Sequence, residues 1–107
     1  ENMGVFTTDG AVDLYHNNVK KFETQADGIT VTGHVEPGAN DTYDLGQSDN
    51  VWRHVYTGDL HLTNEAKAEG NAVDGTKGNW TIQEGAEHLF ILNNKSGKKY
   101  RFELKEV

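Results

Sequence analysis

The sequence predicts an all-β protein built of short antiparallel hairpins. Two observations support this fold class. Short clusters of Asn, Asp and Gly, which favour tight turns, recur along the chain at intervals of about 8–12 residues. Between these clusters, apolar and polar side chains alternate, which is the period of a strand with one buried and one solvated face. At 107 residues, the chain is long enough for one domain and short for two.

The expected strands follow from this alternation in chain order. Strands are predicted at residues 29–32, 80–83, 88–93 and 99–105. The last two are joined by an Asn-Asn-Lys-Ser-Gly-Lys loop, in which Gly97 is expected to take a positive φ. These segments predict a C-terminal hairpin preceded by at least one further strand.

A weak internal repeat relates the two ends of the chain. Residues 9–15 match residues 84–90, and residues 20–22 match residues 98–100 after an Asn-Asn pair in both copies. Each copy is predicted to be a hairpin that runs from an acidic-Gly turn through a strand and an Asn-Asn loop to a Lys-Lys-aromatic strand. Isolated two-stranded hairpins are marginally stable in water. We therefore expect the hairpins to stack, either along the chain or between chains.

The middle of the chain has weaker patterns. Apolar residues in 49–56 have helical spacing, but the run is barely two turns long, so we expect only a helical turn that leads into a strand. Residues 65–78 contain three glycines and are predicted to be a loop with at most one helical turn. These patterns divide the chain into an N-terminal β-hairpin repeat (1–36), a connector (37–64), and a loop with C-terminal β-hairpins (65–107).

Composition excludes several classes of protein. The net charge is −7, which argues against nucleic acid as a partner, because phosphate backbones require clustered Lys and Arg. No apolar run approaches the ~18 residues of a membrane helix, so no membrane insertion is expected. The chain has no cysteine, and its mean hydropathy is −0.74. It begins with Glu1 rather than Met, which is typical of a processed product or a piece of a longer chain.

No residue pattern predicts an enzyme, a metal site or a cofactor. The five histidines have none of the spacings of local metal sites. His61 lies between Leu60 and Leu62, so it points to water if the leucines point inward. The alternative is that three copies of His61 meet on a trimer axis and hold a metal ion or an anion. We predict no catalytic residue.

One segment is apolar on both faces. In a strand over residues 89–92, Leu89 and Ile91 point to one side, and Phe90 and Leu92 point to the other. Such a strand must be covered on both sides. Two covers are open at this point: a neighbouring subunit, or the other strands of a small sandwich in which this strand is central.

Three segments resemble bacteriophage tail fibres and related virion appendages. The first is a Leu-Gly…Trp-Arg…Tyr-x-Gly-x-Leu motif over residues 45–60, similar to a stretch that often precedes an endosialidase-type intramolecular chaperone. Residues 9–33 resemble repeats of marine phage structural proteins, and residues 79–107 resemble the C-terminal hairpin of some of them. The self-cleavage signature of the chaperone is absent from this chain.

The resemblance implies a structural protein of the virion, a homotrimer with interleaved β-strands. Its role would be to hold three chains in register, beside other virion proteins, and to attach to a glycan or protein of the host surface. Residues 38–41 and 71–79 are the expected exposed loops. The residues expected to pack in the trimer are Leu45, Trp52, Val55, Tyr56, Leu60, Leu62, Trp80, Ile82, Leu89, Phe90, Ile91, Leu92, Tyr100 and Phe102.

Three other classes of protein compete with this interpretation. A carbohydrate-binding, lectin-like module would stack sugar on Trp80, Trp52 or Tyr43. A glycan depolymerase would need a site shared between chains and converging carboxylates, which the sequence does not indicate. A bacterial surface or pilus-like fibre subunit would use the same hairpins in an open-ended polymer.

Overall fold

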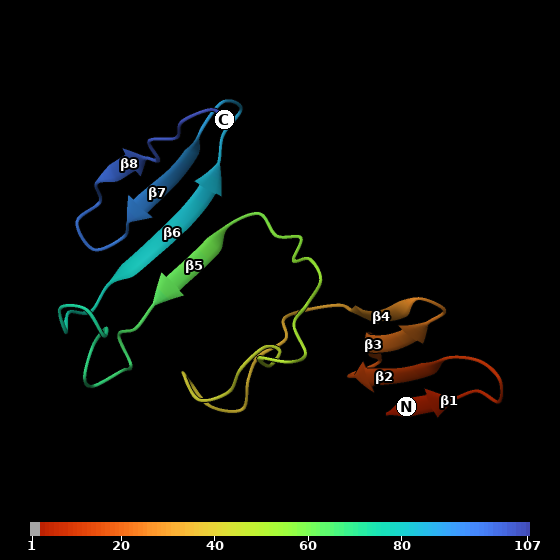
Figure 1. The fold of residues 1–107 in the computed structure, drawn as a ribbon. Helices are drawn as coiled ribbons and strands as arrows, with labels where there is room; N and C mark the ends of the chain where they lie inside the picture. The colour runs from red at the N-terminus through yellow and green to blue at the C-terminus, as the bar shows by residue number, and fades with distance from the viewer. Residues whose placement is uncertain (1–2) are drawn as a thin grey trace. The chain divides into compact units, whose positions relative to one another are not determined.

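The computed structural model describes residues 3–107 and confirms the all-β class (Figure 1). The described residues form eight strands and no helix, arranged as two antiparallel four-stranded sheets. The chain divides into two compact units, residues 1–37 and residues 38–107, and each unit contains one sheet.

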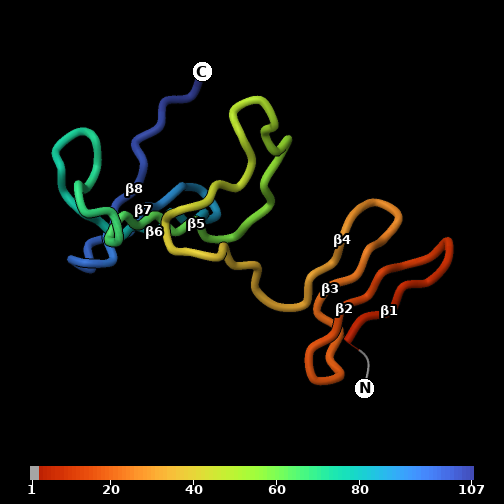
Figure 2. The backbone as a smooth tube through the Cα atoms, turned by 90° about the horizontal axis from the view of Figure 1, so that it is seen from below, coloured from red at the N-terminus to blue at the C-terminus, as the bar shows by residue number. Residues whose placement is uncertain are grey.

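The N-terminal sheet is a meander in which each strand pairs with the next one along the chain. Its strands are β1 (Gly4–Phe6), β2 (Val12–His16), β3 (Val19–Gln25) and β4 (Gly28–Val31). Asn17 and Asn18 form the two-residue turn between β2 and β3, with φ angles of 47° and 64°. Asn tolerates this left-handed conformation, which suits the right-handed twist of the flanking strands. The predicted N-terminal hairpin is confirmed, and its narrow turns can be followed in Figure 2.

The two faces of this sheet differ in chemistry. Leu14 lies opposite Phe22, which lies opposite Val31, so these three apolar residues share one face. Asp13 and Glu23 form a pair on the other face, where the Lys20 ammonium lies 3.0 Å from the Glu23 carboxylate. The alternation in the sequence is therefore reproduced as one apolar and one charged face.

The C-terminal sheet is a second meander. Its strands are β5 (Leu60–Thr63), β6 (Asn79–Glu84), β7 (Leu89–Asn93) and β8 (Lys99–Arg101). The predicted hairpin between β7 and β8 is confirmed, and Gly97 has the expected positive φ, at 77°. The loop between β5 and β6 contains no strand, as predicted, and hydrogen bonds of Asn64 tie its two ends together.

Two local predictions are wrong. Residues 49–56 form no helical turn, and the segment has only an isolated bridge between Gln47 and Asn50. Nucleation of a helix costs free energy, and a helix of two turns is stable only if packing of its apolar side offsets that cost. The apolar side chains of this segment have no cover in the unit. The last strand ends at Arg101 rather than at residue 105. Its neighbour β7 begins at Leu89, which pairs with Phe102, so the following residues have no partner.

Neither sheet has a hydrophobic core of its own. Among residues 3–107, no hydrophobic residue is buried, and Thr81 is the one buried polar side chain. Large hydrophobic side chains are instead exposed in each unit, for example Phe6 at 75% in the first and Leu45 at 81% in the second. Each sheet therefore leaves apolar side chains uncovered within its own unit.

Candidate assembly surface

The C-terminal sheet has one face formed mostly by apolar side chains, with Asn93 opposite Trp80 and Glu84 opposite Leu89 as its polar members. In an antiparallel pair, residues directly opposite each other lie on the same face. Leu60 lies opposite Ile82, Ile82 opposite Ile91, and Ile91 opposite Tyr100. These four residues form one row across all four strands.

Two further apolar pairs flank this row. Leu62 lies opposite Trp80, and the backbone N–H of Phe102 donates to the carbonyl oxygen of Leu89. The rings of Trp80 and Tyr100 have centroids 6.0 Å apart, which places both on this side of the sheet. We call the following set of residues the apolar face: Leu60, Leu62, Trp80, Ile82, Leu89, Ile91, Tyr100 and Phe102.

The apolar face is open to solvent. Leu60 and Leu62 are each 47% exposed, and Tyr100 is 46% exposed. The other members are also exposed or half-buried, and none is buried. A face of eight apolar side chains without a cover is typical of a surface for association rather than of a free sheet surface. These eight residues belong to the set predicted to pack in a trimer.

The remaining six residues of that set lie elsewhere. Phe90 and Leu92 are half-buried on the opposite face of the sheet, as the alternation within the strand predicts. Leu45, Trp52, Val55 and Tyr56 lie in the irregular segment before β5, and each of them is exposed. The structure therefore brings eight of the predicted residues together and leaves six apart from them.

The opposite face is mainly polar and contains the buried Thr81. Its hydroxyl oxygen lies 2.9 Å from Nδ1 of His61 and accepts a hydrogen bond of 2.9 Å from the side-chain amide of Asn94. His61 thus lies on the side away from Leu60 and Leu62. No group of three or more metal-ligating side chains is present in the part of the chain that the structure describes, so the axial ion at His61 stays a hypothesis.

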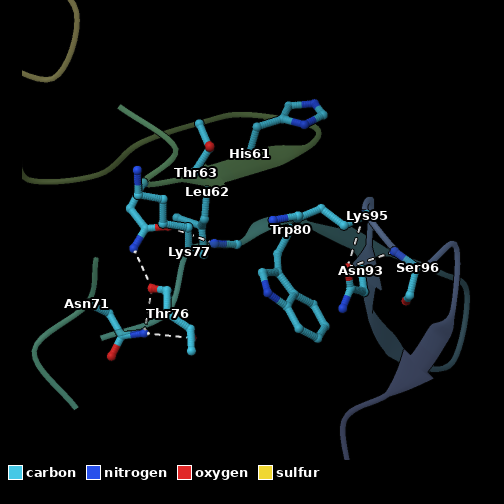
Figure 3. A pocket seen from close by; sticks show the side chains of 12 residues that line it. His61, Leu62, Thr63, Asn71, Thr76, Lys77, Trp80, Asn93, Lys95 and Ser96 are labelled. Carbon is cyan, nitrogen blue, oxygen red and sulfur yellow. Dashed lines mark hydrogen bonds between the residues drawn. The ribbon is translucent and has the colours of Figure 1, made fainter. Parts of the chain in front are cut away.

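A groove of about 730 Å³ lies beside the apolar face, at the end of the sheet where two loops begin. Figure 3 shows Trp80 between the side chains of Asn71 and Thr76 on one side and Asn93 and Ser96 on the other. Lys77 and Lys95 also line this groove, and Lys95 pairs with the Glu65 carboxylate at 3.1 Å. The arrangement combines an aromatic ring with hydrogen-bond donors and positive charge.

Internal hydrogen bonds use much of the polar surface of this groove. The Asn71 side-chain oxygen accepts from the backbone N–H groups of Val73 and Asp74, and its amide donates to Asp74 and Thr76. Hydrogen bonds from the Thr76 hydroxyl and then from the Asn71 amide hold the pKa of Asp74 below its ordinary value. Hydrogen bonds within the loop therefore satisfy much of its polar surface, whereas the sequence predicts only that the loop is exposed.

The N-terminal sheet has its own cluster of charges. The hydrogen bond from the Lys20 ammonium holds the pKa of Glu23 below its ordinary value, and the same bond raises the pKa of Lys20. Asp13 lies 3.7 Å from the same ammonium group. This arrangement resembles an ordinary charged sheet surface, and nothing in it aligns a nucleophile with a base.

Sequence reasoning missed the polar network around Thr81. The alternation of Trp80, Thr81 and Ile82 places Thr81 on the polar face, but only the register brings His61 and Asn94 to the same hydroxyl. The alternation of apolar and polar residues in the sequence predicts on which face of the sheet a side chain lies, but it does not predict which residues of neighbouring strands lie beside it.

Comparison with known proteins gives no match to a family model, to a curated protein or to a solved structure. None of the described residues belongs to a helix long and apolar enough to cross a membrane.

Proposed function

We propose that this protein is a structural subunit of a phage tail fibre or a similar virion appendage, in which three copies pack through their apolar surfaces. The observation that supports it best is the uncovered apolar face, together with the absence of any buried hydrophobic residue among residues 3–107. The proposed action is mechanical: the subunit holds chains in register.

Threefold closure fits the chemistry of the two faces of the C-terminal sheet. Homo-oligomers with closed symmetry cover a recurring apolar surface without creating an open-ended polymer. The apolar face would turn toward sister copies, and the face with Lys99 and Arg101 would turn toward solvent. A trimer would have a net charge of three times −7, or −21, which favours solubility of the outer surface.

In this arrangement, two exposed loops are available for contact with the host surface. Residues 38–41 and 71–79 are the expected sites for contact with a host-surface glycan or protein, and the ordered loop around Asn71 gives such a contact a rigid platform. The virion is the location that belongs to this proposal, with other virion proteins as further partners.

Molar mass in solution tests the proposal. Size-exclusion chromatography with light scattering at micromolar concentration should give three times 11.9 kDa, about 36 kDa. A mass of 11.9 kDa across the accessible concentration range would contradict the proposal. Growth without a fixed mass would instead support the pilus-like subunit.

The groove beside Trp80 favours a second candidate function, a carbohydrate-binding module. Sugars bind through aromatic stacking and donors to their hydroxyl groups, and the lysines at residues 77 and 95 would prefer an acidic sugar. Titration with alginate oligosaccharides, compared with neutral cello-oligosaccharides, should quench the fluorescence of Trp80 if this function is present. Trp80→Ala, followed by calorimetry because the fluorescent side chain is gone, is the variant that should lose the binding. A monomer that binds alginate would favour the module over the fibre subunit.

A further inference from the structure

The segment that precedes β5 has a second uncovered apolar surface. Residues 38–59 contain no strand or helix (Figure 1). Trp52 is 62% exposed and Tyr56 is 91% exposed. The other large exposed hydrophobic residues within 44–56 are Leu45, Val51 and Val55. Below, residues 44–56 are called the apolar segment.

The shape of this segment is fixed around its largest side chain. The backbone groups of Gln47 and Asn50 exchange two hydrogen bonds of 3.1 Å, which close a tight turn. Gly46 precedes that turn with φ of 86°, and the Trp52 ring lies against it, since a Cβ at Gly46 would be 3.4 Å from Cδ1 of the indole. Trp52 is thus presented on a preformed turn, which lowers the entropy cost of burying it against a partner.

The apolar segment exposes about as much apolar area as one side of a standard interface. Each aromatic side chain offers about 150–250 Å². With three aliphatic neighbours of roughly 60–120 Å² each, the segment exposes roughly 500 Å² of apolar surface. A standard interface buries about 800 Å² per partner, of which a little more than half is apolar. The segment therefore supplies about as much apolar area as one side of a stable interface needs.

The segment does not cover the apolar face of its own chain. The exposures of Leu60 and Leu62 show that this face is open beside the strand into which the segment leads. At the junction, the Asp59 carboxylate accepts a hydrogen bond of 3.1 Å from the Gln83 amide, on the polar side of the sheet. Asp59 is thus held on the polar side of the sheet, and Leu60 and Leu62, which follow it, keep their exposed side chains.

We propose that the apolar segment of one copy packs on the apolar face of a neighbouring copy, with Trp52 as its anchor. This inference rests on the proposed self-association and names the two surfaces that make the contact. The occupant of the apolar face is a second copy of this chain, and in a ring of three each copy gives its segment to one neighbour and receives that of the other.

Directed cross-linking tests the contact, because the chain has no cysteine of its own. Chains with Val55→Cys are refolded with ¹⁵N-labelled chains that have Leu62→Cys and are treated with a short bis-maleimide. A matched mixture pairs Val55→Cys with Lys99→Cys, on the opposite face of the same sheet. We expect mass-labelled heterodimers from the first pair in an excess of about tenfold or more, because neighbouring thiols have millimolar effective concentration.

A second measurement covers the case in which these cysteines disturb packing. It uses the original protein, whose two tryptophans are Trp52 on the apolar segment and Trp80 on the apolar face. In the assembly we expect iodide to quench the tryptophan fluorescence at least about fivefold less than in a diluted, dissociated sample, because burial excludes the quencher. A fraction of the fluorescence that stays freely quenched in the assembly would show that Trp52 is uncovered.

The outcomes separate this inference from the proposed function. A trimer with equal cross-linking in both mixtures, and with Trp52 freely quenched, overturns the inference and leaves the trimer standing. A third sample is a chain that has both Val55→Cys and Leu62→Cys. If its cross-links form only within one chain, the segment packs on its own sheet, and this result also overturns the inference. A monomer at all concentrations contradicts the proposed function itself.

Discussion

The effect of Leu62→Ala on assembly should show whether a sister copy covers the apolar face. Leu62 is 47% exposed in the single chain, so Leu62→Ala removes side-chain burial that is only half complete. On the scale of about 1.5–3 kcal/mol for full burial of a leucine, this loss is about 1 kcal/mol. If a sister copy covers the residue, the cost rises to about 2–5 kcal/mol per chain.

The extra free-energy cost per chain counts three times in a trimer. At the lower limit, each chain loses about 1 kcal/mol more than it would alone, which is about 3 kcal/mol per trimer and about a 150-fold change in the dissociation constant. The dissociation constant of a trimer has the units of a squared concentration, so the midpoint concentration scales with its square root. The protein concentration at half-dissociation should therefore rise about tenfold or more. Sedimentation equilibrium over a dilution series measures this midpoint for the original protein and for Leu62→Ala.

The matched control is Val73→Ala. Val73 is 95% exposed in the loop between β5 and β6 and lies outside the apolar face, so its truncation should leave the midpoint unchanged. Equal midpoints for Leu62→Ala and the original protein would refute the reasoning. A large shift for Val73→Ala would show that truncation acts through the loop and not through the apolar face.

Three further predictions concern local structure. Gly70 has φ of 69°, and a Cβ there would collide with the Gly75 carbonyl oxygen, so Gly70→Ala should lower the free energy of unfolding by at least about 1–2 kcal/mol in urea titrations. Asn18→Val should cost about 1–2 kcal/mol in the same assay, because a β-branched residue resists the φ of 64° at that turn, whereas Asn18→Gly should be nearly neutral. The lowered pKa of Asp74 means that its contribution to folding is present above the unfolded pKa and is lost as the pH falls through the folded pKa, below about pH 4. The protection of the Thr76 amide, measured against its intrinsic exchange rate at the same pH, should fall in that window, because this N–H donates to Asp74. Asp74→Ala should abolish the pH step. Protection of Thr76 that stays constant down to pH 2.5 would contradict the role of Asp74.

Turn chemistry made the hairpins predictable from the sequence. The Asn17-Asn18 pair and the loop with Gly97 fix where the chain reverses, and both turns were located correctly. The alternation of residues 89–92 correctly assigned side chains to the two faces of β7. These features depend on residues that are close in sequence, so local patterns determine them.

The failed predictions depended on partners that are distant in sequence. The last strand ends at Arg101 because β7 offers no further backbone groups to pair with. The helical spacing within 49–56 had no packed face to stabilise it, so the segment stayed irregular. The apolar face could be listed residue by residue, but only the register showed that Leu60, Ile82 and Tyr100 form one row.

The dependence of unfolding on protein concentration tests the central claim most directly. Thermal melts, followed by circular dichroism over a thousandfold dilution, compare folding of one chain with folding that requires sister copies. If the sheets are stable because neighbouring copies cover their apolar surfaces, the melting temperature should fall steadily with dilution. A single cooperative transition at one temperature, at every concentration and with the mass of a monomer, would contradict the account.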